Sequence, residues 1–220
     1  MTRIGKIALC LGLLLGLFAL SFCEEPLLSV SFAKDAWNPA DWVLAHNPTI
    51  AHLGQWVQRD DCIENATSAD PAKASSLEES LTTMVYSKPF AADFTASATF
   101  RIGPGAAPGI VLAQDWAPDG DNRPQYGEFY EAIIYERGIN LWHHFAQDGK
   151  RTYEKSAFYE FELKPNASYE FTVRRKGQAL EMSVDGHKAG VLVHTLPEKL
   201  FLGVEGCEGV CQVMNFKVTP

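Results

Sequence analysis

Apolar and polar residues alternate with a period of two in most segments after residue 25. In residues 94–102, Phe, Ala, Ala, Phe and Ile occupy every second position, with Thr, Ser, Thr and Arg between them. The same alternation occurs in 169–174 and 180–185, and in the last segment through Met214, Phe216 and Val218. About a dozen such segments, bounded by Gly, Pro, Asn or Asp, predict an all-β domain built from antiparallel sheets, either a sandwich or a barrel.

Helix is scarce in this pattern. Only Ser75–Leu81 favours a helix, because Ser75 or Ser76 can cap it ahead of two glutamates. The longest irregular segments, 64–75 and 115–125, have neither a linker composition nor a repeat. We therefore expect one domain, spanning residues 24–220.

Residues 1–23 predict an export signal. Arg3 and Lys6 flank the start of an apolar run at 7–20, which is followed by polar Ser21. This is the layout of a cleaved secretory signal peptide, and the run is short for a membrane span. A lipoprotein acylated at Cys23 is less favoured, because the preceding Phe occupies a position where a small residue is wanted. We expect a periplasmic or secreted protein.

The charge of the chain bears on its partners. A formal net charge of −8 and a pI near 5.2 argue against nucleic acid or an anionic membrane surface as the ligand. We therefore expect no nucleic-acid partner, and the acidity is most simply a solubility feature.

The cysteines fit an oxidising compartment. Cys62, Cys207 and Cys211 follow the signal segment, and the Cys-Glu-Gly-Val-Cys spacing at 207–211 does not match a Cys-x-x-Cys redox or zinc motif. We expect one disulfide, either between Cys207 and Cys211 or from one of them to Cys62. The pairing stays open.

Residues 126–145 concentrate the candidate chemistry, and they read as two strands joined by a turn. Along the second strand one side is formed by Ile139, Leu141, His143 and Phe145. The other side is formed by Asn140, Trp142 and His144. An aromatic ring beside polar groups suits stacking on a sugar ring, so we predict that this second side binds a ligand.

The turn of this hairpin decides the side on which Glu131 lies. A two-residue loop at 137–138 pairs Glu131 with His144 on the polar face, which makes a workable acid–base pair. A three-residue turn pairs Tyr130 with His144 instead, and places Glu131 beside His143 on the core side. The Glu-Arg-Gly order favours the three-residue turn with a glycine bulge.

The loop at 115–122 is a second candidate site. Its oxygen-bearing side chains, Asp115, Asp119 and Asp121, suit calcium, although they do not follow the spacing of an EF-hand loop. Asp-Gly turns are also common in all-β proteins without a metal. We expect no cofactor other than this structural calcium. Trp116 in the same loop is predicted to flank the ligand groove.

Three sequence segments resemble those of the concanavalin A-like lectin/glucanase superfamily. They are residues 179–187, residues 200–206 with the closing strand 213–218, and residues 94–102 with 108–112. Their order is similar to that of laminin-G-like domains and of the 3-keto-disaccharide hydrolase domain family, in which a Tyr-Glu pair recurs that Tyr130-Glu131 matches. The resemblance implies a two-sheet antiparallel β-sandwich, a jelly roll, with carbohydrate on one sheet face.

The chain departs from the glucanases of that superfamily, which carry Glu-x-Asp-x-Glu on one strand. Here Glu128 and Glu131 are three residues apart and face opposite sides of a regular strand, and Glu131 and Glu136 also differ in parity. A standard retaining glucanase is therefore disfavoured. We expect an exported carbohydrate-binding domain that uses Trp142 and its neighbours.

Two alternatives stay open. One is a glycoside hydrolase or lyase that uses Glu131 with His144, and the other is a structural or adhesion module without a small-molecule site. Glu131 facing His144 in a groove would favour the first of these.

Overall fold

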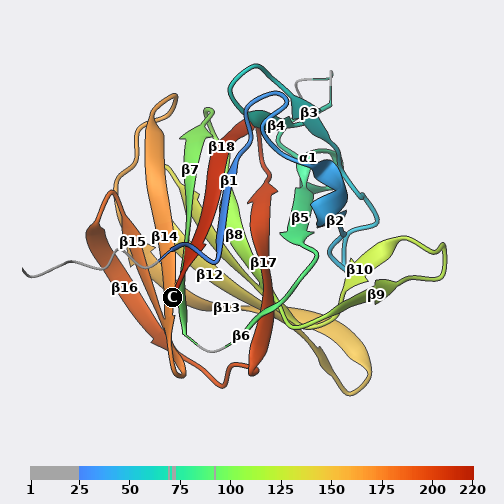
Figure 1. The fold of residues 1–220 in the computed structure, drawn as a ribbon. Helices are drawn as coiled ribbons and strands as arrows, with labels where there is room; N and C mark the ends of the chain where they lie inside the picture. Colours follow the sequence, from blue (N-terminus) through green and yellow to red (C-terminus); the bar gives the residue numbers. More distant parts are fainter. Residues whose placement is uncertain (1–24, 69, 71–72, 92) are drawn as a thin grey trace, which may run out of the picture.

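A computed structural model describes residues 25–220 except 69, 71, 72 and 92 (Figure 1). The predicted signal peptide, including Cys23, lies outside these residues. No helix in the described part of the chain is long and apolar enough to cross a membrane.

Two antiparallel sheets of eight strands each form the fold, as the alternating pattern predicts. The strands of the first sheet follow one another in the order β16 (His187–Val193), β15 (Ala179–Val184), β14 (Ser168–Lys176), β7 (Phe94–Ile102), β18 (Cys211–Thr219), β4 (Ile63–Asn65) and β3 (Trp56–Gln58), and β1 (Leu28–Ser31) also pairs with β18.

The second sheet has the order β13 (Lys150–Glu160), β12 (Gly138–Gln147), β11 (Phe129–Tyr135), β8 (Gly109–Ala113), β17 (Lys199–Gly206), β5 (Thr82–Tyr86) and β2 (Trp42–Leu44), and β6 (Phe90–Ala91) also pairs with β17. A separate ribbon is made by β9 (Trp116–Pro118) and β10 (Pro124–Tyr126). The two sheets make the predicted β-sandwich (Figure 1).

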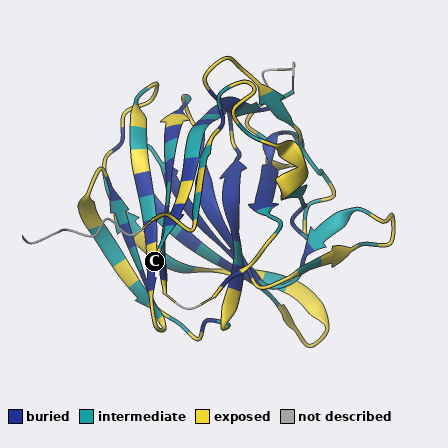
Figure 2. Ribbon diagram, viewed as in Figure 1, coloured by how far each residue is buried: buried dark blue, intermediate teal, exposed yellow. Residues whose placement is uncertain are grey.

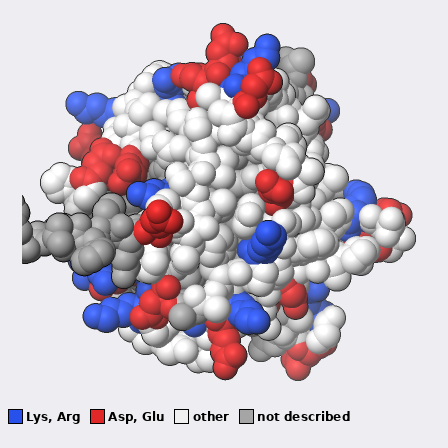
Figure 3. All heavy atoms as spheres, in the orientation of Figure 1, with Lys and Arg blue, Asp and Glu red and all other residues white. Residues whose placement is uncertain are grey.

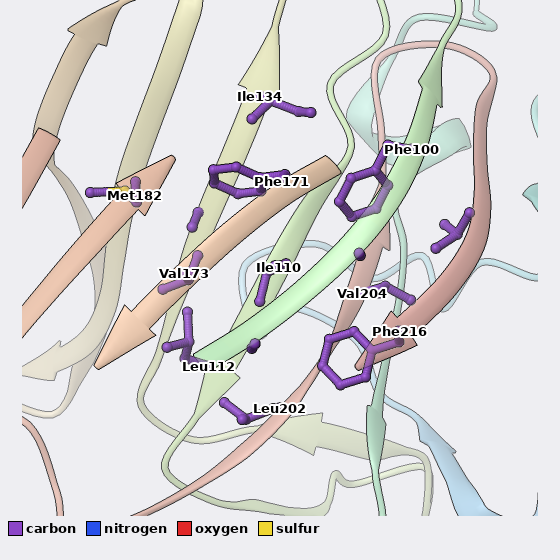
Figure 4. Packing of buried hydrophobic residues seen from close by; sticks show 14 of the residues in the cluster. Phe100, Ile110, Leu112, Ile134, Phe171, Val173, Met182, Leu202, Val204 and Phe216 are labelled. Carbon is purple, nitrogen blue, oxygen red and sulfur yellow. The ribbon is translucent and has the colours of Figure 1, made fainter. Parts of the chain in front are cut away.

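The core fills the space between the two sheets. Phe100 and Phe171 of the first sheet lie close to Ile110, Leu112 and Ile134 of the second, as Figure 4 shows, and all five are fully buried. In β7 every second residue is buried, whereas all five residues of β8 are buried. The second sheet is therefore covered on both faces at its centre, where the ribbon is dark blue in Figure 2.

The helical content is small, as the sequence indicates. Helix α1 (Leu77–Ser80) lies inside the predicted segment, and its N-cap residue Ser76 has an extended backbone. A short 3-10 helix covers Pro39–Asp41.

The last strand corrects one sequence prediction. The register of β18 against β7 shifts between Val213 and Asn215, so the strand carries a bulge at Met214. Because a bulge reverses the parity of the residues before it, Val213 is buried in the core and Met214 is only half-buried.

The predicted disulfide is not formed. Cys62, Cys207 and Cys211 are buried free thiols. Cys211 packs in the core between the sheets, whereas Cys207 packs with Leu81 and Ala107 on the other side of the second sheet. The turn between the two cysteines therefore sends their side chains into different clusters. Burial raises the pKa of Cys62 to about 11 and raises the pKa of the other two as well.

The surface charges of both signs are interspersed on the face shown in Figure 3. Acidic and basic side chains stand next to one another around its rim. On this face the acidic side chains are therefore spread out and stand among basic ones.

Candidate functional site

The β11–β12 hairpin differs from both registers considered from the sequence. Tyr135 pairs with Gly138, so residues 136–137 form a two-residue turn, and Glu131 lies directly opposite Trp142. The favoured three-residue turn is therefore wrong. The observed pairing assigns residues to the two faces of the hairpin in the same way as the two-residue loop at 137–138 would. It places Glu131 on the same face as Trp142.

Gly138 has another role than the expected bulge. Its φ is +152°, and a Cβ atom there would overlap the carbonyl oxygen of Tyr159 on β13. Glycine is thus required by the close approach of β13 to the start of β12.

A cavity of about 440 Å³ lies over the face of the second sheet that points away from the core. Strands β11, β12 and β17 supply its base, and helix α1 and the segment after β2 supply its sides. The predicted residues that line it are Glu131, Asn140, Trp142 and His144. The structure therefore brings together four of the six residues predicted for the hairpin site and its surroundings.

Glu131 and His144 form the central contact of this cavity. The Nε2 atom of His144 lies 2.8 Å from Oε2 of Glu131, and both residues are 6% exposed. The ring of His144 also stacks on Phe129 at a centroid distance of 4.3 Å, which fixes its orientation. The contact places a carboxyl group and an imidazole side by side in the lining of the cavity.

Asn47 completes the network, and nothing in the pattern of residues around it singles it out. Its Oδ1 atom accepts hydrogen bonds from the backbone N–H and the hydroxyl of Thr49, at 3.0 and 2.8 Å. The amide nitrogen therefore points the other way, where it lies 3.4 Å from Oε1 of Glu131 and 3.5 Å from Nδ1 of His144.

The network assigns a tautomer to His144. Because the Asn47 amide nitrogen can only donate, Nδ1 of His144 accepts and its Nε2 carries the proton that points at Glu131. The N–H at Nε2 of His144 is therefore the donor, and Glu131 the acceptor, in their contact.

A second carboxyl group, Glu205, lies in the same cavity. It is fully buried on β17, which is separated from β11 by β8 alone. Among the described residues neither of its carboxyl oxygens has a hydrogen-bond partner. Burial first, and then the charge of Glu131, raise the pKa of Glu205 well above its ordinary value.

Burial without a partner bears on the protonation of Glu205. Because its pKa is raised, the protonated, neutral form of this carboxyl group is favoured. The alternation of Leu200, Leu202 and Val204 would have placed Glu205 on the outer face of its strand. A lone glutamate in an otherwise apolar strand is the signal that could have identified it.

Trp142 forms part of the cavity wall beside these polar groups. It is half-buried, packs edge-on against Tyr153 at 5.9 Å between centroids, and has Nζ of Lys155 5.1 Å from its ring centre. The buried Oδ1 atom of Asn140 has no partner among the described residues. The wall therefore combines an aromatic surface with an unused acceptor.

Two predicted ligand-binding residues lie elsewhere. Tyr130 is on the core side of β11, where its hydroxyl is 2.7 Å from Nδ1 of His194. Trp116, on β9, packs against Phe201 with 6.4 Å between ring centroids and does not line the cavity. Neither belongs to the surface that Trp142 and His144 form.

The aspartates of the 115–122 loop do not converge on one point. Asp119 binds the guanidinium of Arg123, with Nη2 at 2.8 Å, and Nε2 of His46 at 3.0 Å. In the described part of the chain Asp115, Asp119 and Asp121 do not form a group of ligand atoms close enough to hold one ion. The predicted calcium site gains no support from this arrangement.

The fold is that of the concanavalin A-like jelly rolls, although no family model and no curated protein matches the chain. β-Agarase A from Zobellia galactanivorans has a TM-score of 0.61 at 11% identity, with 87% of this chain and 89% of the agarase covered. The carbohydrate-binding module CBM66 from Bacillus subtilis has a TM-score of 0.58 at 13% identity, with coverage of 82% and 96%. The carbohydrate recognition domain of Emp47p has a TM-score of 0.55 at 13% identity, with coverage of 87% and 94%.

Proposed function

We propose that this protein is exported and binds a carbohydrate in the cavity on the outer face of the second sheet. The observation that carries the proposal is the half-buried ring of Trp142 beside the Glu131–His144 pair. Aromatic rings stack on the apolar faces of sugars, and carboxylates accept hydrogen bonds from sugar hydroxyls.

The size and composition of the cavity support a small saccharide as the ligand. Its volume of about 440 Å³ lies within the range of small-molecule pockets, about 300–1,000 Å³. The carboxyl, amide and imidazole groups that line the cavity, on Glu131, Asn140 and His144, suit a neutral, hydroxyl-rich ligand better than an anion. The similar structures include a carbohydrate-binding module and a carbohydrate recognition domain, which supports the same ligand class.

Export rests on the first 23 residues, whose basic start and apolar run have the layout of a signal peptide. An exported protein meets polysaccharides outside the cytoplasm, which agrees with the proposed ligand.

A glycan array tests the proposal. The wild-type chain from residue 24 onward is expected to bind at least one glycan, and Trp142→Ala is expected to lose that binding by tenfold or more. Trp116→Phe is the matched control, because Trp116 is on the same side of the second sheet but outside the cavity. The carbohydrate proposal is contradicted if no glycan binds, or if Trp142→Ala binds as tightly as the wild type.

A second candidate function is cleavage of a glycosidic bond by Glu131 with His144. It is favoured by the 2.8 Å contact between them, which presents a carboxyl group and an imidazole together in the cavity. Glu205, a buried carboxyl with a raised pKa, lies in the same cavity and can act as a general acid. Turnover of a saccharide panel tests it: Glu131→Gln should abolish turnover, and turnover that survives this change rules the candidate out.

A further inference from the structure

A second cluster of polar side chains lies on the opposite side of β12 from the carbohydrate cavity. His143 precedes His144 in the strand and points to the core side, where it is opposite Glu154 of β13 in the sheet register. His194, which directly follows β16, reaches the same place: its ring is 4.8 Å from that of His143. The cluster thus joins the edge strands of both sheets.

Each histidine of the cluster has one ring nitrogen bound and the other one free for a ligand. His143 uses Nε2 to contact Oε1 of Glu128 at 2.9 Å, while its buried Nδ1 has no partner among the described residues. His194 uses Nδ1 to contact the hydroxyl of Tyr130 at 2.7 Å, which leaves Nε2. An unpartnered nitrogen on a side chain that is 8% exposed is costly unless something binds it.

The three possible ligand atoms lie close to one another. One atom each from His143, Glu154 and His194 lies within 4.8 Å of the others, and Nδ1 of His143 is 3.9 Å from Oε1 of Glu154. In a tetrahedral zinc site with bonds of about 2.0–2.1 Å, ligand atoms are roughly 3.4 Å apart. Glu154 has an exposed side chain, so it has room to turn toward the imidazoles.

The surroundings hold the imidazole of His143 in place. His143 is stacked between Tyr130 and Phe145, with centroid distances of 4.4 and 4.7 Å. Its contact with Glu128 has the form of a carboxylate–histidine pair behind a metal, an arrangement that fixes the tautomer and raises the basicity of the ligand nitrogen.

We propose that His143, His194 and Glu154 form a binding site for a divalent transition metal, with Zn²⁺ as the ion that fits best. Two imidazole nitrogens and one carboxylate oxygen are zinc ligands, and three protein ligands leave a fourth position for water or an outside ligand. This site is separate from the carbohydrate cavity, because neighbouring residues of β12 point to opposite faces of the sheet.

Isothermal titration calorimetry, in which Zn²⁺ is added to the metal-free chain from residue 24 onward, tests the proposal. One Zn²⁺ should bind per chain, and Co²⁺ at the same site should give the visible absorption of a tetrahedral complex. His194→Gln and Glu154→Gln should each weaken binding at least tenfold. His187→Gln, which changes an exposed histidine outside the cluster, should leave it unchanged.

His194 and Glu154 are at the surface side of the cluster, so their variants are suited to the test even where a change at buried His143 prevents folding. Zn²⁺ should also raise the Tm of the wild type and not that of the two variants. The proposal is overturned if stoichiometric Zn²⁺ does not bind, or if binding and the Tm shift survive in both variants. Glycan binding by Trp142 is an independent readout, so failure of either proposal leaves the other standing.

Discussion

Glu131 and His144 are in contact at 2.8 Å although they are not cross-strand partners in the β11–β12 hairpin. Glu131 is opposite Trp142, and His144 is opposite Phe129, so the contact is a diagonal one on the outer face of the sheet. A shift of the register by one residue would move Glu131 to the core side. The cavity therefore depends on the two-residue turn at 136–137.

Glu205→Gln should stabilise the protein increasingly as the pH rises. Because the pKa of Glu205 is raised in the folded state, its contribution is fully present below the pKa of the unfolded chain, about 4.3, and is lost as the pH rises toward the folded pKa. One such group changes the free energy of unfolding by at most about 1.4 kcal/mol per pH unit. Urea unfolding of both proteins from pH 4 to pH 8 measures the difference.

Glu78→Gln is the control for this measurement. A hydrogen bond from the Ser76 hydroxyl lowers the pKa of Glu78, so its contribution is present at neutral pH and is lost as the pH falls. The two variants should therefore differ from the wild type with opposite dependence on pH. A stability difference for Glu205→Gln that stays constant between pH 4 and pH 8 would contradict the raised pKa of Glu205.

Gly203→Ala should destabilise the fold by about 1–3 kcal/mol, the usual cost of forcing extra atoms into a packed site. A Cβ atom at Gly203 would overlap the carbonyl oxygen of Met84 and lie 2.6 Å from the Cα atom of Val85, both in the backbone of β5. Thermal unfolding measures this. Gly120→Ala is the control, because nothing lies within 4 Å of the added atom, and it should change the stability by less than about 0.5 kcal/mol. Equal effects of the two changes would contradict the close approach of β5 and β17.

The three thiols should be unreactive in the native chain from residue 25 onward. Cys62, Cys207 and Cys211 are buried, and burial raises their pKa values, so little thiolate is available for alkylation at pH 8. Denaturation without a reductant should expose three titratable thiols. A count of one would instead reveal the disulfide that the sequence favours.

His144 should carry its proton on Nε2. The Asn47 amide, held by Thr49, donates toward Nδ1, while Nε2 points at Glu131. Long-range ¹H–¹⁵N NMR spectra distinguish the two tautomers. In Asn47→Ala the preference should weaken, whereas exposed His187 should give the same signals in both proteins. A proton on Nδ1 in the wild type would contradict the network.

The sequence predicted the layers of the fold well, because period-two burial is a local property. The strand 94–102 was predicted with its observed bounds, since nothing interrupts the alternation there. The bulge at Met214 could not be predicted in this way, because the extra residue is set by pairing with β7 rather than by the residues of the last segment.

The candidate site was predicted in part, for the same reason. Asn140, Trp142 and His144 share a face by parity alone, and this was confirmed. The side of Glu131 depended on one turn, and the sequence favoured the wrong turn. Asn47 and Glu205 are far from the hairpin in the chain. The sheet order brings Glu205 to it, and the segment after β2, in which His46 bridges Gln125, brings Asn47.

The indole N–H signals of the five tryptophans give the most direct test of the proposed carbohydrate site. In a ¹H–¹⁵N spectrum each indole is a separate probe, and the glycan found on the array is added to saturation. The Trp142 signal should shift, while the signals of Trp37, Trp42 and Trp116, which do not line the cavity, should stay in place. A glycan that leaves Trp142 unchanged and shifts Trp116 instead would contradict the cavity as the binding site.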